Sequence, residues 1–310
     1  MFEMESLYAV SGMRFFKKGG AEAMKVERWI KEGLRCFDGA TGTMLIQLGL
    51  KAGECPEMVS EEVMMKVHLA YIDAGSQYIT TNTFGANRPK LAKFKLDDEV
   101  AKINRRNAGV ARKTAVGRGV LVAGDIGPTG ELIEPYGDYT REMFIDIFSE
   151  QAKVLGESAV DLIIIETMTS IEELEASIHA VKSVTSLPVI ATMTFDKDAQ
   201  GRYRTMMGVT PEMAVRVMEE KAVDACGANC SLSPSDMIDL VREFRKLTHL
   251  PLIFQPNAGK PKIVDDKTVY EPIPDLEKSI SQIIAAGADI VGGCCGTDPK
   301  YISVLRRLLR

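Results

Sequence analysis

Asp161-Leu162-Ile163-Ile164-Ile165-Glu166-Thr167-Met168 is the stretch of sequence that best indicates the fold. Its four consecutive apolar residues, 162–165, are typical of a parallel strand that is buried on both faces of a sheet. A strand with one face in solvent would alternate apolar and polar residues instead. The stretch therefore predicts an α/β protein in which helices pack against a parallel sheet.

Similar runs recur along the chain and are separated by helical stretches. The helical period is clear in residues such as Met237, Leu240, Val241 and Phe244, which follow the i, i+3, i+4, i+7 spacing. Strict alternation, without a dinucleotide-binding Gly-x-Gly-x-x-Gly motif, favours a single closed (β/α)8 TIM barrel; an open doubly wound sheet is the alternative. The candidate strands are residues 35–40, 77–84, 120–126, 161–168, 189–195, 225–231, 252–255 and 288–292.

Length and pattern predict one domain with an extension. A chain of 310 residues suits a barrel, which typically needs about 250. Residues 1–21 have no convincing period and are expected to be an N-terminal extension, followed by a short helix from Glu22. Residues 22–310 are expected to form the barrel, because no linker or change in composition divides them.

Composition limits the classes of partner. The net charge of −5 and the absence of a basic run give no electrostatic signature for nucleic acid or an anionic membrane. No apolar stretch approaches the roughly 20 residues of a membrane span, and the N-terminus has no secretory pattern. We therefore expect a cytoplasmic protein with a small-molecule partner, in which the six cysteines serve thiol or metal chemistry rather than disulfides.

Polar and sulfur side chains gather where the candidate strands end. Active residues of TIM barrels lie at the C-terminal ends of the strands and in the loops that follow. The long loops, 41–60, 127–139, 196–208 and 258–274, leave from the same end and suit a lid over a small ligand. The strand-end residues are Asp38, Asn82, Asp125, Glu166, Thr194, Asn229, Cys230, Asn257, Cys294 and Cys295.

Three of these residues suggest a metal site. Cys230, Cys294 and Cys295 would provide three thiolates, and three protein ligands with one open position are typical of catalytic zinc. Adjacent residues on a regular strand point to opposite faces, so the cysteine pair needs local distortion, which Gly292, Gly293 and Gly296 would permit. Two buried small side chains, or a disulfide between neighbours, are the alternatives.

The open position suggests activation of a substrate thiol, because coordination deprotonates a thiol that is mostly neutral at pH 7. If the substrate is an amino acid that carries a thiol, Asp38 and Glu166 can accept hydrogen bonds from its ammonium group, and the turn at residues 39–43 can offer backbone N–H groups to its carboxylate. Asp38 could instead cap the following helix, and Glu166 could belong to a structural ion pair. Asn82, Asp125 and Asn229 could simply satisfy backbone groups at the rim of the barrel.

The motifs together resemble the homocysteine S-methyltransferase family over residues 35–309. This resemblance implies that Cys230, Cys294 and Cys295 bind zinc, and that Asp38 and Glu166 hold the homocysteine amine. It also implies that Asn257 caps the zinc when substrate is absent. The matching segments are Phe37-Asp38-Gly39-Ala40-Thr41-Gly42-Thr43, His68-Leu69-Ala70-Tyr71-Ile72-Asp73-Ala74-Gly75, Thr81-Asn82-Thr83-Phe84, Gly227-Ala228-Asn229-Cys230, Pro256-Asn257-Ala258-Gly259 and Gly292-Gly293-Cys294-Cys295-Gly296-Thr297.

The resemblance predicts zinc-dependent methyl transfer to homocysteine, which gives methionine. Asn82, Asn229 and the turn residues Gly39, Ala40 and Thr41 are the further candidates for substrate binding. The expected donor is methylcobalamin or a methylated corrinoid protein, supplied separately because the chain has no corrinoid-ligating Asp-x-His-x-x-Gly motif. S-methylmethionine and betaine are alternative donors. A non-catalytic subunit that binds a thiol or a metal is the alternative from another class.

Overall fold

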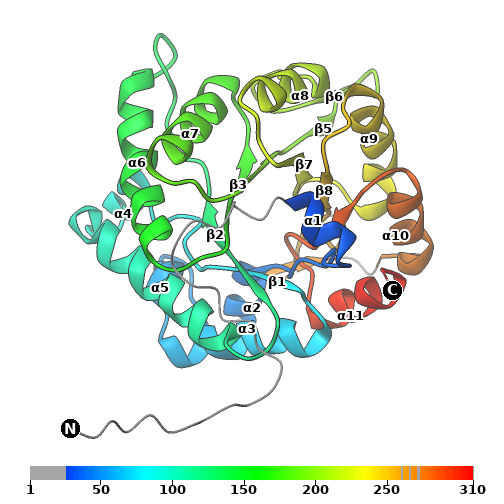
Figure 1. The fold of residues 1–310 in the computed structure, drawn as a ribbon, viewed down its shortest axis with the longest axis horizontal. Coiled ribbons are helices and arrows are strands. Elements are labelled where there is room, and N and C mark those ends of the chain that lie inside the picture. The colour runs from blue at the N-terminus through cyan, green and yellow to red at the C-terminus, as the bar shows by residue number, and fades with distance from the viewer. Residues whose placement is uncertain (1–25, 260, 265–266, 271–272, 310) are drawn as a thin grey trace, which may run out of the picture.

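The computed structural model describes residues 26–259, 261–264, 267–270 and 273–309, in which a ring of helices surrounds parallel strands (Figure 1). The predicted extension, residues 1–21, lies outside the described residues. One seven-stranded sheet runs in the order β1-β2-β3-β4-β7-β8-β11, and every neighbouring pair is parallel. Its strands are β1 (Tyr78–Thr80), β2 (Leu121–Ile126), β3 (Leu162–Met168), β4 (Val189–Met193), β7 (Ala225–Asn229), β8 (Leu252–Gln255) and β11 (Ile290–Val291).

Cys36 occupies the eighth position and closes the ring. It forms a parallel bridge with Val291, and the N–H of Phe37 donates to the Val291 carbonyl over 2.9 Å. On its other side the Cys36 carbonyl accepts from the N–H groups of Gln77 and Tyr78, over 2.8 and 3.2 Å. The predicted (β/α)8 barrel is therefore confirmed, although the predicted strand at 35–40 is reduced to one bridge residue.

The helices pack around the outside of the strands. Several helices are preceded by a Ser, Thr or Asp whose side chain accepts a hydrogen bond from the N–H three residues later, which stabilises the start of the helix. These helices are α3, α6, α7, α8, α9 and α11. The helices are α1 (Val26–Lys31), α2 (Thr41–Gln47), α3 (Glu61–Ala74), α4 (Arg88–Ala92), α5 (Val100–Ala115), α6 (Arg141–Glu157), α7 (Ile171–Val184), α8 (Pro211–Glu220), α9 (Pro234–Leu247), α10 (Leu276–Ala285) and α11 (Pro299–Leu308), with short 3₁₀ turns η1 (Pro56–Met58) and η2 (Asp97–Glu99).

None of the described helices is long and apolar enough to cross a bilayer. The cytoplasmic location and the absence of a nucleic-acid partner stay predictions.

Period-two alternation along the strands divides the core in two. Ile163 and Ile165 point outward into the large cluster that packs beneath the helices, whereas Leu162 and Ile164 point into the barrel. The interior cluster is closed at the N-terminal end by Val26 and Trp29 of α1, which lies across the barrel (Figure 1). Its other members are Phe37, Tyr78, Ala123, Leu162, Ile164, Ile190, Ala225, Ile253 and Ile290.

The same inward positions become polar two residues further along several strands. Ala123 is followed by Asp125, Ile164 by Glu166, Ile190 by Thr192 and Ile253 by Gln255. The barrel therefore has an apolar floor and a polar layer above it, at the C-terminal ends of the strands.

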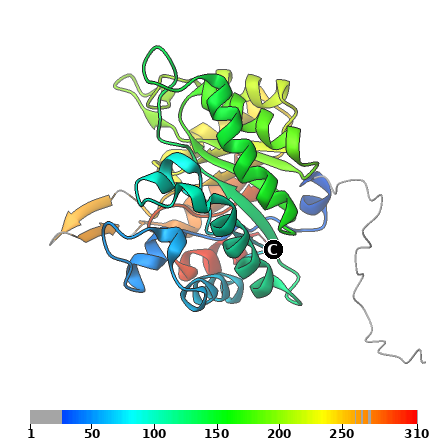
Figure 2. The ribbon, with the colours of Figure 1, turned by 90° about the vertical axis from the view of Figure 1, so that its left-hand side faces the viewer.

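Two small hairpins extend from the loops at this end of the barrel. One pairs β5 (Asp196–Lys197) with β6 (Tyr203–Arg204), and the other pairs β9 (Pro261–Val264) with β10 (Lys267–Tyr270). Figure 2 shows the β9–β10 hairpin in orange standing out on the side of the molecule opposite α1. The long loops that the sequence indicated thus carry structure of their own.

Candidate metal and substrate site

A cavity of about 280 Å³ lies above the polar layer. It contains carboxyl, hydroxyl and sulfur groups, but no Lys, Arg or His among the described residues that line it. Of the predicted site residues, Asp38, Gly39, Ala40, Thr41, Asn82, Glu166 and the three cysteines Cys230, Cys294 and Cys295 line it together with Gly42, Thr43, Pro56, Glu57, Thr80, Thr81, Phe84, Asp125, Thr167, Gln255 and Gly293.

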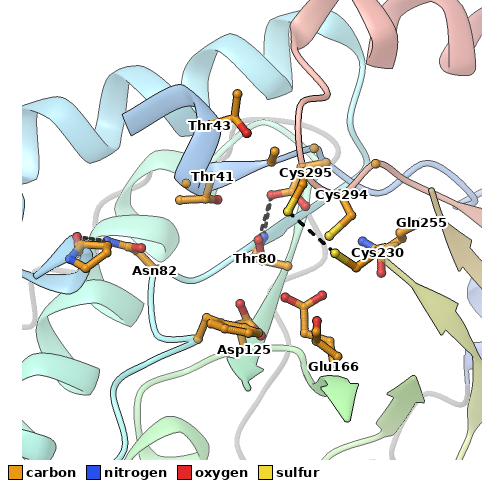
Figure 3. A pocket seen from close by; sticks show the side chains of 18 of the residues that line it. Thr41, Thr43, Thr80, Asn82, Asp125, Glu166, Cys230, Gln255, Cys294 and Cys295 are labelled. Atoms are coloured by element: carbon orange, nitrogen blue, oxygen red, sulfur yellow. Dashed lines mark hydrogen bonds between the residues drawn. The ribbon is translucent and has the colours of Figure 1, made fainter. Parts of the chain in front are cut away.

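The three predicted metal ligands meet on one wall of the cavity (Figure 3). The sulfur atoms of Cys230, Cys294 and Cys295 all lie within 4.8 Å of one another, and those of Cys230 and Cys295 are 3.7 Å apart. Zn–S bonds of about 2.3 Å at tetrahedral angles separate two sulfurs by about 3.8 Å. The cluster therefore fits a zinc ion in both donor type and spacing.

The adjacent cysteines can face one point because the strand has already ended. β11 stops at Val291, and residues 292–297 form a turn in which the N–H of Cys294 donates to the Pro256 carbonyl over 2.9 Å. The carbonyl of Cys295 accepts from Ala258, also over 2.9 Å. Gly296 has a φ of 81°, which favours glycine. The distortion predicted for this pair is thus a complete departure from strand geometry.

Cys230 also sits in unusual backbone. It follows β7 directly and has a φ of 64°, a conformation that non-glycine residues adopt rarely and mainly where the surroundings impose it. Its N–H donates to the Gln255 carbonyl over 3.0 Å. Three residues earlier, a Cβ at Gly227 would lie 1.7 Å from the Ile253 carbonyl oxygen, so glycine lets β7 lie close against β8. Together these contacts fix the direction of the Cys230 side chain.

Thr297 ties the cysteine turn to the glycine-rich turn after Asp38. Its hydroxyl donates to the Cys294 carbonyl over 2.8 Å and accepts from the Ala40 N–H over 3.0 Å. Thr43 adds a second link by accepting from the Gly296 N–H over 2.9 Å. The sequence placed Thr297 in a motif but gave it no role, since its partner is more than 250 residues away.

The thiols differ in their tendency to ionise. The Cys230 and Cys294 sulfurs lower the pKa of Cys295 to about 3, whereas the Cys230 and Cys295 sulfurs, together with burial, raise the pKa of Cys294 well above its usual range. Burial raises the pKa of both Cys36 and Cys226 to about 12, and both lie in the cluster that packs between the strands and the helices. All six cysteines are free thiols.

Asp38 and Glu166 contribute carboxyl groups to the cavity. One oxygen of Asp38 accepts from the N–H and hydroxyl of Thr80, over 2.8 and 3.1 Å, and burial raises the pKa of Asp38 to about 7. Burial raises the pKa of Glu166 to about 8, with nearby Cys230 adding to the shift. A register irregularity of β3 falls between Ile165 and Met168, and such bulges redirect side chains beside functional sites.

Asn229 stands behind the wall rather than on it. Its Nδ2 donates to the carboxylate of Glu166 over 3.0 Å and to the hydroxyl of Thr167 over 2.7 Å, and it lies 3.8 Å from the Cys294 sulfur. Its Oδ1 accepts from the Thr167 N–H and the Thr192 hydroxyl, over 2.9 and 2.8 Å. Asn229 therefore orients both a carboxylate and a sulfur of the site.

The remaining predicted residues occupy different positions. Asn82 lines the cavity, and its amide donates to the Pro56 carbonyl over 2.8 Å. Asn257 is 4% exposed and is not among the described residues that line the cavity, although its neighbours hydrogen-bond to the cysteine turn. Its Oδ1 has no hydrogen-bond partner within the described part of the chain. The role of Asn257 as a zinc cap stays a prediction.

The fold and site define a TIM barrel with a thiolate cluster at its C-terminal rim, and comparison with known proteins gives the family. Residues 35–309 match the model of the homocysteine S-methyltransferase family, so the chain belongs to that family. Membership identifies it as a methyltransferase, and confirms the resemblance found in the sequence.

Individual relatives agree with this assignment. The chain is 28% identical to the methionine synthase of Mycobacterium tuberculosis over 286 residues, and 27% identical to that of Mycobacterium leprae. These matches cover 86% of this chain but only 24% and 23% of the relatives, so the chain spans about a quarter of their length. The metallated form of the homocysteine methyltransferase MmuM from Escherichia coli superposes with a TM-score of 0.75 at 25% identity, covering 91% of this chain and 98% of that one.

Proposed function

We propose that this chain transfers a methyl group to the thiol of homocysteine, giving methionine, at a zinc ion held by Cys230, Cys294 and Cys295. The observation that carries the proposal is the meeting of three sulfurs at zinc-like spacing on the wall of a cavity that also holds buried carboxyl groups. Family membership supports the reaction, and the names of the mycobacterial relatives support methionine as the product.

The three cysteines would hold the zinc ion, and they line the cavity, where a substrate thiol can approach them. When bound, zinc with three thiolates supplies a site at which a substrate thiol loses its proton while its sulfur stays nucleophilic. In the reaction the homocysteine sulfur forms a bond to the methyl carbon as the bond between that carbon and the donor breaks, and the thiol proton passes to solvent. The backbone contacts of the cysteine turn hold the ligands for this purpose.

The carboxyl groups orient the substrate. Asp38 and Glu166 accept hydrogen bonds from the ammonium group of homocysteine, which is favourable because the burial that disfavours an unpaired carboxylate strengthens a charge-assisted bond. Gly39, Ala40 and Thr41 surround the substrate carboxylate. They take the place of a basic side chain, because none is among the described residues that line the cavity. Asn82 also lines the cavity and is a further candidate for contact with the substrate. Positioning of this kind accelerates the reaction by aligning the sulfur with the incoming methyl group.

For the donor we propose methylcobalamin or a methylated corrinoid protein, which reaches the cavity from the rim that carries the β9–β10 hairpin. Sequence similarity to methionine synthases much longer than this chain supports a donor held by a separate protein or domain. S-methylmethionine and betaine are the alternative donors. The match covers almost all of MmuM, a homocysteine methyltransferase about as long as this chain, and this supports the alternative of a free small donor.

One assay panel tests the reaction and the donor together. The purified, zinc-analysed chain is mixed with L-homocysteine and, in separate reactions, methylcobalamin, a methylated corrinoid protein, S-methylmethionine or betaine, and methionine is measured. We expect about one zinc per chain and methionine formation with a corrinoid donor. Binding of homocysteine without methionine from any donor would instead favour a non-catalytic subunit that presents the thiol to a partner.

A further inference from the structure

One carboxyl group in the cavity has no assigned role, and one of its oxygens has no partner among the described residues. Four carboxyl side chains line the cavity, those of Asp38, Glu57, Asp125 and Glu166. Protein groups donate to three of them: Thr80 to Asp38, Gly85 and Cys55 to Glu57, and Asn229 to Glu166. The Oδ1 atom of Asp125 has no hydrogen-bond partner within the described part of the chain, although the residue is only 5% exposed.

The backbone holds Asp125 firmly in this position. It lies near the end of β2, where its N–H donates to the hydroxyl oxygen of Thr81 over 3.0 Å and its carbonyl accepts from the hydroxyl of Thr83 over 2.7 Å. Figure 3 shows Asp125 beside Glu166, on the side of the cavity that faces the three cysteines. A buried acceptor left without a donor costs free energy, and such groups are rare unless they serve a ligand. Asp125 is therefore available to a donor on a ligand in the cavity.

We infer that Asp125 binds the ammonium group of the substrate as its third carboxylate partner, alongside Asp38 and Glu166. An ammonium group has three N–H donors, and the cavity offers three carboxyl groups for them while Glu57 is already occupied. The inference rests on the proposed function and deepens it, because it adds a third residue to the selection of an amino thiol over a plain thiol. Burial and the nearby Glu166 raise the pKa of Asp125, and a bound cation would favour its ionised form.

The test compares two thiols that differ only in the ammonium group. L-homocysteine and 4-mercaptobutanoate share the thiol, the carbon chain and the carboxylate. Binding of each to the zinc-loaded chain is measured by calorimetry for the wild type and for Asp125→Asn, which keeps the shape and removes the charge. We expect the variant to bind L-homocysteine about 10- to 100-fold more weakly, the usual range for a hydrogen bond to a charged group, and to bind 4-mercaptobutanoate as the wild type does.

Glu57→Gln is the matched control, since it changes a cavity carboxyl group whose two oxygens already accept hydrogen bonds within the protein. We expect it to leave the ratio of the two affinities unchanged. Because 4-mercaptobutanoate also reports whether Asp125→Asn is folded, equal weakening of both thiols, or an unchanged ratio, would overturn the role of Asp125 while leaving the proposed function intact. Failure of the wild type to bind L-homocysteine would overturn the proposed function and this inference with it.

Discussion

The two walls of the cavity reach their function by different structural means. The sulfur wall consists of turns beyond β7 and β11, in which Cys230 has a positive φ and the adjacent cysteines are held by backbone bonds from distant segments. The carboxylate wall, which is the set of carboxyl groups of Asp38, Asp125 and Glu166, is simpler. Asp125 and Glu166 extend the inward alternation of β2 and β3 by one step. A metal cluster needs three atoms aimed at one point, whereas an ammonium site needs only buried acceptors within reach.

The walls also differ in what they do to stability. The thiols of the sulfur wall can remain neutral when no metal is bound, apart from Cys295. The carboxyl groups are buried without a cation, and burial raises the pKa of both Asp38 and Glu166. Without substrate, the carboxylate wall therefore opposes folding, as is common where a site is prepared for a ligand.

The largest expected effect comes from the sulfur wall. Replacing Cys295 by Ala removes one of three ligands, so we expect the chain to lose stoichiometric zinc and methyl transfer to fall by more than about 1,000-fold, the scale seen when a group acting on the reacting atom is removed. Metal analysis and initial rates of methionine formation measure the two losses.

Cys226→Ala is the matched control, because Cys226 lies four residues before Cys230 but points into the core. It should keep its zinc and lose only about 1 kcal/mol of unfolding free energy, through the small cavity that it leaves. Full zinc content in the Cys295 variant, or loss of zinc in the Cys226 variant, would contradict the assignment of the metal site.

On the carboxylate wall, Glu166→Gln should raise the KM for homocysteine by about 100-fold and leave the zinc content unchanged. The reason is that the variant removes the charge of a buried partner of the ammonium group while keeping its shape. Steady-state rates over a range of homocysteine concentrations give the effect, and zinc analysis gives the control. An unchanged KM would show that Glu166 serves only the structure, through its bond to Asn229.

The difference between the walls also explains how much the sequence could predict. The apolar run at 162–165 and its repeats were enough for the barrel, because parallel strands buried on both faces have few other patterns. The three cysteines and both Asp38 and Glu166 were found as strand-end residues. Contacts between distant segments could not be found in this way, such as the bonds from Thr297 to the turn after Asp38.

The burial and hydrogen bonding of individual polar side chains also cannot be predicted from the sequence. Asp125 was recognised as a strand-end residue, but nothing in its neighbours distinguished an unpartnered carboxyl group from one that satisfies backbone groups. The sequence indicates Asn229 either as a substrate-binding residue or as one that satisfies backbone groups at the rim; in the structure its side chain is fully buried and supports residues that line the cavity. Both distinctions depend on packing between strands and not on the order of residues along one strand.

A smaller effect should appear in the pH dependence of stability. Because the pKa of Asp38 is about 7 in the folded protein and about 3.8 unfolded, the folded state binds more protons between these values. The stability present below the unfolded pKa is therefore lost as pH rises toward 7. Between pH 5 and pH 7 we expect the wild type to lose about 2 kcal/mol of unfolding free energy relative to Asp38→Asn, in the absence of homocysteine.

Urea unfolding of both proteins at pH 5, 6 and 7 measures this difference. Asn keeps an acceptor for Thr80, so the comparison isolates the charge. Groups that do not interact with Asp38 cancel in the difference, whereas Glu166 and Asp125, whose pKa the Asp38 charge raises, add to the change in the same direction. Parallel pH profiles would mean that Asp38 is already ionised at pH 5, and that the carboxylate wall does not oppose folding through this residue.

The smallest effect joins the two walls. Asn229 donates to Glu166 and lies against the sulfur of Cys294, so Asn229→Ala should weaken both zinc affinity and homocysteine affinity by about 10-fold, the lower end for residues that orient metal ligands. Combined with Glu166→Gln, the loss in homocysteine affinity should be less than additive, because both changes remove one interaction, while the loss in zinc affinity should be that of Asn229→Ala alone. Thr194→Val is the control, since the Thr194 hydroxyl donates to the backbone carbonyl of Asn229 and not to its side chain, and the variant should leave both affinities within about twofold. A variant of Asn229 that weakened one affinity and spared the other would show that the two walls are built independently.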